Sequence, residues 1–240
     1  MAFRIFNFEI RKINEKKKNI IEISKYEKTL IKKCLQYSMT NFERMWSLIQ
    51  SFHHVKQESL IGDFVECGIW KGGNIILLKK LLQKFNVKKK IYCFDTFEGM
   101  TKPTSHDSNY NGKSAKIMYD DHEKKKIGFA ECSLNEVKKN LIKNANIDNV
   151  IFIKGKVENT LNNKKNLPKK ISILRLDTDF YESTKIELEI LFPRLVKGGI
   201  LIIDDYGFWK GARKAVDDYF GDCRQFFHYV DHSCRLLIKK

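Results

Sequence analysis

Apolar residues from position 60 onward follow two alternating spacings. Short runs rich in isoleucine, valine and phenylalanine are apolar on both faces, as in strands that helices cover on both sides. These runs span residues 62–68, 91–97, 150–155, 171–177 and 199–205. Segments with apolar residues at helical spacing lie between them, at 73–85, 133–145 and 182–195. Such alternation predicts βαβ units and a doubly wound α/β fold with a mostly parallel sheet and helices on both faces.

Both ends of the chain depart from this alternation. Residues 225–231 and 234–240 predict two strands joined by a short turn, so that a C-terminal antiparallel hairpin closes the sheet. Segment 41–55 predicts an amphipathic helix ahead of the first strand. The first 33 residues are charged and weakly periodic, and an extra helix, a lid and an interaction arm all fit them. We therefore expect a helical N-terminal cap.

The composition indicates one cytoplasmic domain. With 240 residues, of which 42% are hydrophobic, the chain can bury one sizeable core. No apolar run approaches the roughly 20 residues that cross a bilayer, and the N-terminal sequence has no signal-peptide core. The six cysteines contain no CxxC pair, which fits reduced thiols better than a zinc site or a disulfide framework.

The net charge of +16 raises the question of an anionic partner. A basic surface attracts nucleic acid, anionic lipid or phosphorylated substrates. The excess is almost all lysine and is spread along the chain, which is typical of a solvated surface. We find no aromatic-rich basic platform of the kind that stacks bases, which disfavours nucleic acid as a partner.

Acidic residues and glycines follow the first two predicted strands, where the ligand site of a doubly wound sheet lies. Glu66 precedes the glycine-rich turn "ECGIWKGGN", which contains Gly68 and Gly72 and is not the GxGxxG cradle of dinucleotides. Such a turn suits a ligand with a cationic amino-acid part, although the glycines could equally serve only a tight turn. Asp95 ends the second strand, where a carboxylate accepts hydrogen bonds from a ribose diol.

Four carboxylates follow the last two parallel strands. Asp177 and Asp179 stand in "LDTDFYEST", and Asp204 and Asp205 in "IIDDYG". Buried acids this close repel one another unless a cation joins them, and oxygen ligands favour Mg²⁺, Mn²⁺ or Ca²⁺ over zinc. In the alternative interpretation one acid caps the helix near Glu182, or the adjacent pair binds surface lysines.

Four motifs together resemble the macrocin O-methyltransferase family. They are "GDFVECGIWKGGN", "FDTFEGM", "LRLDTDFYEST" and "IIDDYGFWKGARKAVDDYF", and the resemblance covers roughly residues 34–220. Members of that family are class I S-adenosylmethionine-dependent enzymes that methylate sugar hydroxyls of natural products. The resemblance implies a Rossmann-like methyltransferase fold with a seven-stranded sheet. We expect an N-terminal cap or lid over residues 1–58 and the methyltransferase domain over residues 59–240.

The resemblance also assigns roles to residues of the cofactor site. It implies that Glu66 and Gly68 hold the amino-acid part of S-adenosylmethionine and that Asp95 binds its ribose. The turn at 155–158 would lie beside the adenine. The full set of expected cofactor contacts is Glu66, Gly68, Gly72, Asp95, Lys156, Val157 and Asp177.

For the chemistry, the family's Mg²⁺-dependent members imply that Asp177, Asp204 and Asp205 are the metal ligands. Asp179 would be the general base that takes the proton of the sugar hydroxyl. The polar insertion between the second strand and the next helix is expected to cover the acceptor pocket. Trp70 and Trp209 near the site could equally be packing residues.

Three other functions fit the same residues. A catechol-like phenol or an RNA ribose could be the methyl acceptor, and a non-catalytic scaffold could retain the fold. The sequence does not specify which glycan, nucleotide sugar or natural product carries the acceptor hydroxyl. A homo-oligomer is compatible with the charged N-terminal segment.

Overall fold

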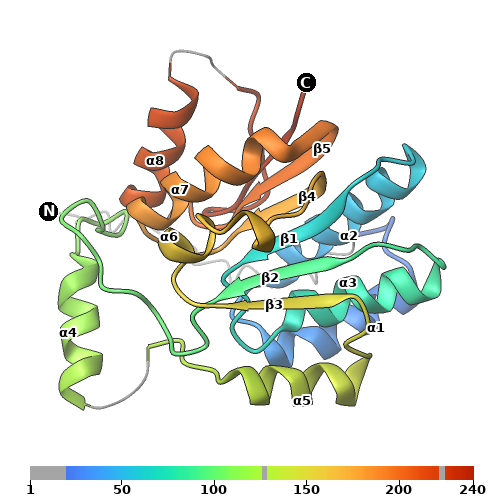
Figure 1. The fold of residues 1–240 in the computed structure, drawn as a ribbon, viewed down its shortest axis with the longest axis horizontal. Helices are drawn as coiled ribbons and strands as arrows, with labels where there is room; N and C mark the ends of the chain where they lie inside the picture. Colours follow the sequence, from blue (N-terminus) through green and yellow to red (C-terminus); the bar gives the residue numbers. More distant parts are fainter. Residues whose placement is uncertain (1–19, 126–128, 222–224) are drawn as a thin grey trace, which may run out of the picture.

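The architecture is a seven-stranded sheet between two layers of helices (Figure 1). The structure is a computed structural model that describes residues 20–125, 129–221 and 225–240. The strands lie in the order β3-β2-β1-β4-β5-β7-β6. Their bounds are β1 Asp63–Cys67, β2 Ile91–Asp95, β3 Val150–Lys154, β4 Ile171–Leu176, β5 Leu195–Ile203, β6 His228–Tyr229 and β7 Arg235–Ile238.

The first five strands are parallel, and β7 runs antiparallel to both β5 and β6. The predicted parallel sheet with an antiparallel hairpin at its end is therefore confirmed. From β1 the chain builds outward to β2 and β3, and then returns to place β4 and β5 on the other side of β1. The strand order thus reverses between β1 and β4, and a doubly wound sheet binds its ligand at the carboxyl ends beside such a reversal.

Helices cover both faces of the sheet (Figure 1). One layer holds α1 Lys25–Cys34, α2 Phe42–Gln57, α3 Gly73–Lys84 and α5 Leu134–Asn144. The other layer holds α6 Val157–Thr160, α7 Tyr181–Leu191 and α8 Lys210–Phe220. Short 3-10 turns are η1 Leu35–Tyr37, η2 Lys164–Asn166 and η3 Phe192–Arg194. Helix α4 Ala115–Lys125, within the insertion after β2, stands apart from both layers. None of the helices in the described ranges is long and apolar enough to cross a membrane.

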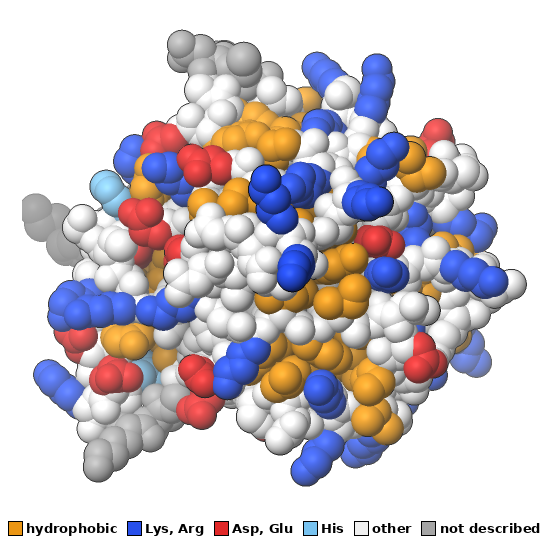
Figure 2. All heavy atoms as spheres, in the orientation of Figure 1, with side chains coloured by type: hydrophobic (Ala, Val, Ile, Leu, Met, Phe, Trp, Pro, Cys, Tyr) orange, Lys and Arg blue, Asp and Glu red, His pale blue; other side chains and the backbone are white. Residues whose placement is uncertain are grey.

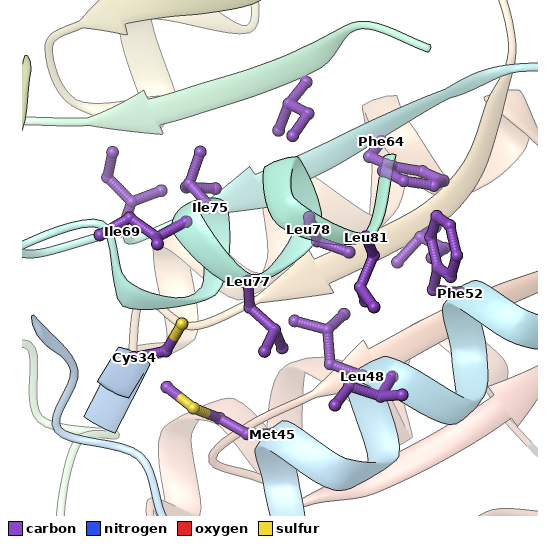
Figure 3. Close-up of a cluster of buried hydrophobic side chains, with 14 of the residues drawn as sticks. Cys34, Met45, Leu48, Phe52, Phe64, Ile69, Ile75, Leu77, Leu78 and Leu81 are labelled. Atoms are coloured by element: carbon purple, nitrogen blue, oxygen red, sulfur yellow. The ribbon is translucent and has the colours of Figure 1, made fainter. Parts of the chain in front are cut away.

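Successive side chains along each strand point to opposite faces of the sheet and pack into two separate hydrophobic cores. Phe64 of β1 belongs to the core under α1, α2, α3 and α5, whereas Val65 and Cys67 belong to the core under α6, α7 and α8. Figure 3 shows Phe64 facing Phe52 of α2, with the leucines of α3 beside them. The two phenylalanine rings meet edge to face, with centroids 6.3 Å apart. The N-terminal helices therefore complete a core of the sheet itself, and the predicted boundary at residue 58 stays a prediction.

Helix α1 is one element that the sequence pattern left open. Ser24 caps it, because its hydroxyl accepts a hydrogen bond from the backbone of Glu27 while the Glu27 carboxylate accepts one from the backbone of Ser24. This reciprocal capping box has the sequence signature Ser-x-x-Glu. The residues before position 20, which were included in the predicted cap, lie outside the described residues.

The predicted helix over 182–195 and strand over 199–205 have different bounds in the structure. Helix α7 ends at Leu191 and passes into η3, because Pro193 lacks the backbone N–H that would continue the helix. Strand β5 then begins at Leu195 and ends at Ile203. Asp204 and Asp205 therefore lie just beyond the strand, in the loop at its carboxyl end.

The positive charge is distributed over the surface. Figure 2 shows lysine and arginine side chains scattered over the visible face, with acidic and apolar side chains between them. This distribution agrees with the solvated lysine surface expected from the sequence.

We expect Phe52→Ala to lower the free energy of unfolding by about 3 to 5 kcal/mol, because its ring is 1% exposed and fills the core between α2 and β1. Urea unfolding followed by circular dichroism measures this change. Ile142→Ala on α5 is the control, since its side chain is 60% exposed, and it should change stability by no more than about 0.5 kcal/mol. Equal losses in the two variants would contradict the placement of α2 in the core.

Candidate active site

A cavity of about 300 Å³ lies at the carboxyl ends of the parallel strands, on the side where the strand order reverses. Its lining includes one residue at or just beyond the end of each of the five parallel strands, namely Gly68, Asp95, Val157, Asp177 and Asp205. Its wall also includes apolar side chains of the N-terminal region and of the insertion after β2, namely Met39, Met100 and Met118. Such a cavity, apolar with a few convergent polar groups, is typical of a small-molecule site.

Gly68 lets three strand ends approach closely. Its φ is +78°, and a Cβ at this position would lie 2.0 Å from the carbonyl oxygen of Asp177. The Gly68 N–H donates to the carbonyl of Phe94, 2.8 Å away, and the Asp177 N–H donates to that of Cys67, 2.9 Å away. Only glycine fits this turn, which opens a backbone surface toward the cavity.

Glu66 is a buried carboxylate with one oxygen available. Its Oε1 accepts hydrogen bonds from Asn74, at 2.9 Å, and from Arg175, at 2.8 Å. Its Oε2 is buried and has no hydrogen-bond partner among the residues that the structure describes. Burial raises the pKa of Glu66, although Arg175 opposes the shift. A cationic group that reached Oε2 would satisfy this oxygen.

Asp95 fastens the glycine-rich turn to β2. Its Oδ2 accepts hydrogen bonds from the backbone N–H groups of Ile69, at 2.8 Å, and Trp70, at 3.1 Å. Its Oδ1 accepts one from Phe97, at 2.7 Å. Trp70 and Phe97 both have positive φ, so the carboxylate holds two tight turns at the mouth of the cavity. The ribose contact predicted for Asp95 stays a prediction.

The other expected cofactor contacts divide into two groups. Val157 lines the cavity at the start of α6, whereas Lys156 before it is exposed and outside the cavity wall. Gly72 also lies outside the wall, where a Cβ would come within 2.8 Å of Leu141. Gly72 permits the close packing of α3 on α5 and the left-handed entry into α3, and its predicted cofactor contact stays a prediction.

Two arginines hold Asp204. Arg175 of β4 donates to Oδ1 of Asp204 at 2.5 Å and, through its other terminal nitrogen, to Asp177 at 2.6 Å. Arg44 of α2 donates to Oδ2 of Asp204 and, at 2.7 Å, to Asp231 in the turn between β6 and β7. Both oxygens of Asp204 are thus bound by guanidinium groups, and the side chains of Arg175 and Asp204 are 3% and 5% exposed.

Asp177, Asp179 and Asp205 form a group of carboxylates that could hold a metal ion. One oxygen from each lies within 4.8 Å of the others. The ligand set implied by the family resemblance contains Asp204 in place of Asp179, and the structure brings only Asp177 and Asp205 of that set together. Oδ2 of Asp205 is buried, and within the described part of the chain no hydrogen-bond partner reaches it. Both ligand sets stay predictions.

Burial and mutual repulsion perturb these acids. Burial, together with the charges of Asp177 and Asp204, raises the pKa of Asp179 to about 7. Burial also raises the pKa of Asp177 and of Asp205 well above the ordinary value, and neighbouring carboxylates add to both shifts. Protons or a divalent cation can relieve such repulsion, and an all-oxygen group fits Mg²⁺.

Sequence reasoning missed both arginines. Arg175 had a signal, because it is a charged residue inside the apolar run "ISILRLD", where burial requires a partner of opposite charge. No feature of the sequence marks Arg44 as a buried, paired residue, since an arginine on an amphipathic helix is normally solvated. Its partner Asp204 is 160 positions away in the sequence.

The residues present fit S-adenosylmethionine and a divalent cation. The unpaired oxygen of Glu66 and the open backbone at Gly68 suit a cationic amino-acid group, and the three grouped acids suit the metal. Comparison of the fold with solved structures identifies the class of protein. A structure of the O-methyltransferase NovP matches with a TM-score of 0.74 and 27% identity, over 85% of this chain and 82% of that chain. The protein has the class I methyltransferase fold.

The macrocin-O-methyltransferase (TylF) family model matches residues 2–231. The chain belongs to this family, which is a family of O-methyltransferases. An 8-demethyl-8-(2,3-dimethoxy-alpha-L-rhamnosyl)-tetracenomycin-C 4'-O-methyltransferase from Streptomyces olivaceus is 32% identical over 187 residues, or 77% of this chain and 68% of the relative. The demethyldecarbamoylnovobiocin O-methyltransferase from Streptomyces niveus is 29% identical over 186 residues, or 76% and 67% of the two chains. The family expected from the motifs is confirmed, and a methyltransferase fold implies S-adenosylmethionine.

Asp179→Asn tests the acid group through the pH dependence of stability. Because folding raises the pKa of Asp179 from 3.8 to about 7, its contribution is complete below pH 3.8 and is lost as pH rises through 7. In metal-free buffer at a pH below 3.8, where Asp179 is largely protonated in both states, the two proteins should melt at similar temperatures. At pH 8.5 the wild type should melt about 3 °C or more below Asp179→Asn. Differential scanning calorimetry with EDTA measures this, and a difference independent of pH would refute the shift.

Arg44→Met tests the charge pairing of Asp204. The change keeps the apolar stem and leaves Asp204 and Asp231 short of one positive charge, so we expect a loss of about 3 kcal/mol in the free energy of unfolding. Urea titration at low salt measures it. Arg213→Met is the matched control, since Arg213 is exposed on α8 and should cost no more than about 0.5 kcal/mol. A neutral Arg44→Met variant would mean that its ion pairs contribute nothing.

Proposed function

We propose that the protein is an S-adenosylmethionine- and Mg²⁺-dependent O-methyltransferase that acts on a sugar hydroxyl of a glycosylated small molecule or nucleotide sugar. The observation that carries the proposal is that three grouped carboxylates, Asp177, Asp179 and Asp205, line the same cavity as Gly68, Asp95 and Val157. The relative from Streptomyces olivaceus supports the sugar, because its name specifies a rhamnosyl 4'-O-methyltransferase.

On this proposal Glu66 and the Gly68 turn would bind the amino-acid end of the cofactor. Asp95 would accept hydrogen bonds from its ribose, and Val157 would pack against the adenine with Lys156 at the exposed rim. When bound, S-adenosylmethionine supplies a methyl group on a sulfonium. That positive charge suits the cavity, because the acidic residues in its wall outnumber its arginine, Arg44.

Asp177 and Asp205 would hold Mg²⁺, with Asp204 as the third ligand that the family resemblance implies. When bound, such an ion lowers the pKa of a nearby hydroxyl. Asp179 would accept the hydroxyl proton, and the position of one of its oxygens within 4.8 Å of oxygens of Asp177 and Asp205 supports this role. A carboxylate with a pKa near 7 is a competent general base at neutral pH.

The acceptor would lie against the apolar wall of the cavity. Trp70 and Trp209 line it together with Met100 and Met118, and the C–H faces of a sugar ring pack well on such side chains. The insertion after β2 contributes Met100 and Met118, which supports its expected role in the acceptor pocket. The scattered lysines of Figure 2 give no support to an RNA acceptor. A cytoplasmic location and a homo-oligomer stay predictions.

Calorimetric titration of S-adenosylhomocysteine into metal-stripped protein tests the cofactor. We expect saturable 1:1 binding, and its absence with and without Mg²⁺ would sink the proposal. Methyl transfer is then measured on dTDP-rhamnose, methyl α-L-rhamnoside and 3,4-dihydroxybenzoate as acceptors.

We expect transfer to a sugar that requires Mg²⁺ and falls at least 100-fold in Asp205→Asn. Asp120→Asn is the control, because Asp120 lies on α4 with its side chain 42% exposed. Transfer only to the phenol would favour the catechol alternative. Transfer that EDTA leaves unchanged would remove the metal from the proposal.

A further inference from the structure

Asp107 joins the insertion after β2 to the loop that carries Asp179. It lies in the polar stretch before α4, and it is only 1% exposed although α4 itself stands away from the body of the protein. A buried carboxylate is retained only where hydrogen bonds satisfy it. The partners of Asp107 come from two segments that are distant in sequence.

One oxygen of the Asp107 carboxylate faces each segment. Oδ1 accepts a hydrogen bond from the backbone N–H of Tyr181, at 2.8 Å, which is the first residue of α7 and the second after Asp179. Oδ2 accepts hydrogen bonds from the backbone N–H of Thr104, at 2.7 Å, and from its hydroxyl, at 2.9 Å. The backbone carbonyl of Asp107 accepts a further bond from Ala115, the start of α4, at 2.8 Å.

Helix α8 closes over this contact at a glycine. A Cβ on Gly211 would lie 2.0 Å from Oδ1 of Asp107 and 3.0 Å from the backbone nitrogen of Tyr181. The neighbouring Lys210 N–H donates to the carbonyl of Ser108 at 2.8 Å. The insertion, the start of α7 and the start of α8 thus meet at one point, and the absent side chain of Gly211 is what permits their approach.

The loop between β4 and α7 needs such support. Asp179 has a φ of +70°, a left-handed conformation that costs free energy for a residue other than glycine. The hydroxyl of the preceding residue, Thr178, donates a hydrogen bond to the buried carboxylate of Glu187 on α7, 3.0 Å away. On the cavity side, the Trp209 side chain hydrogen-bonds with Asp179. Asp107 supplies the attachment on the remaining side, through Tyr181.

The same insertion forms part of the cavity wall. Met100 and Thr101 precede Asp107, Met118 follows it on α4, and all three line the cavity. A segment that contacts the acceptor and a segment that carries the base are therefore bound to the two oxygens of one carboxylate. Neither segment can shift without straining the other.

We propose that Asp107 is a positioning residue that couples closure of the acceptor pocket to the placement of Asp179. The inference rests on the proposed function for the role of Asp179, whereas the coupling itself concerns only the two segments. Seating of an acceptor against Met100 and Met118 holds Asp107, and Asp107 in turn holds the Asp179 loop in its left-handed conformation. Specificity for the acceptor and proton transfer then share one structural element.

Three variants and a control test the coupling. Asp107→Ala removes both sets of hydrogen bonds, and Asp107→Asn keeps an oxygen that can accept from Tyr181. Gly211→Ala keeps the carboxylate and displaces it, while alanine favours helix α8 itself. Asp120→Asn changes an acid on α4 of the same insertion whose side chain is 42% exposed. Each is bound to S-adenosylhomocysteine and compared with wild type by amide hydrogen exchange.

We expect exchange to rise at least tenfold in both segments, 100–118 and 177–183, in Asp107→Ala and in Gly211→Ala. Asp107→Asn, which keeps one accepting oxygen and loses the other, should lie between wild type and Asp107→Ala. Asp120→Asn should equal wild type. The affinity for S-adenosylhomocysteine, measured by calorimetry, should stay within twofold, because Glu66, Gly68, Asp95 and Val157, four of the residues expected to bind the cofactor, lie outside both segments. A rise confined to 100–118 would overturn the coupling, and so would a loss of cofactor affinity in proportion to the rise.

Methyl transfer supplies the second readout, with the sugar acceptor that the panel above identifies. We expect kcat to fall about 10- to 100-fold in Asp107→Ala and Gly211→Ala, as a misplaced base does. Asp107→Asn should lose less than Asp107→Ala, because one of its two accepting oxygens remains. A change in KM alone would overturn the positioning role. If the wild type transfers methyl to no acceptor, the proposed function fails, and hydrogen exchange alone then decides the coupling.

Discussion

The ion pairs of Arg175 are the interaction on which the rest of the site depends. This guanidinium is buried in the middle of the sheet and touches Glu66 on β1 at 2.8 Å, Asp177 at 2.6 Å and Asp204 at 2.5 Å. Without it, three buried carboxylates would face one another across the carboxyl ends of neighbouring strands, at a cost of several kcal/mol each. Arg175 holds Glu66, which is expected to bind the cofactor, at a fixed distance from Asp177 and Asp204, which are expected to bind the metal. The reversal of strand order creates the cavity, and the positive charge of Arg175 stabilises the acids at its edge.

A second layer of contacts fixes the loops that leave the strands. Asp95 holds the turn after β1 through backbone N–H groups, Gly68 lets β1 and β4 touch, and Glu187 supports the loop after β4. The first two contacts each join the ends of two strands, and the third joins α7 to the loop that precedes it. The position of any one acid therefore depends on several elements. These contacts explain how Asp179 can keep a left-handed backbone conformation. They also explain how its carboxylate can lie close to those of Asp177 and Asp205. The surrounding structure determines their positions more strongly than their repulsion opposes them.

The sequence predicted what depends on local pattern. Strand and helix spacing identified β1 to β5 and the hairpin, and the acids at strand ends identified the edge of the sheet where the cavity lies. The motifs identified the family. What it could not predict depends on pairs far apart in the chain. Arg44 and Asp204 are separated by 160 positions and Asp107 and Tyr181 by 74, and the packing that requires Gly211 arises only when α8 closes on the insertion. Whether Asp179 or Asp204 groups with Asp177 also depends on distant contacts, because Arg44 and Arg175 bind Asp204.

The contact of Arg44 with Asp231 has a consequence for synthesis of the protein. These residues lie 187 positions apart, and Asn41 beside Arg44 also donates to Asp231, at 2.5 Å. A nascent chain emerges from the ribosome N-terminal part first, so α2 must wait for nearly all of the remaining chain before its arginine finds both carboxylates. Until then the edge of β5 next to Asp204 lacks its β7 neighbour as well. Arg44, which lines the cavity, therefore gains its second carboxylate partner only after Trp209, the last residue of the cavity wall, has been made.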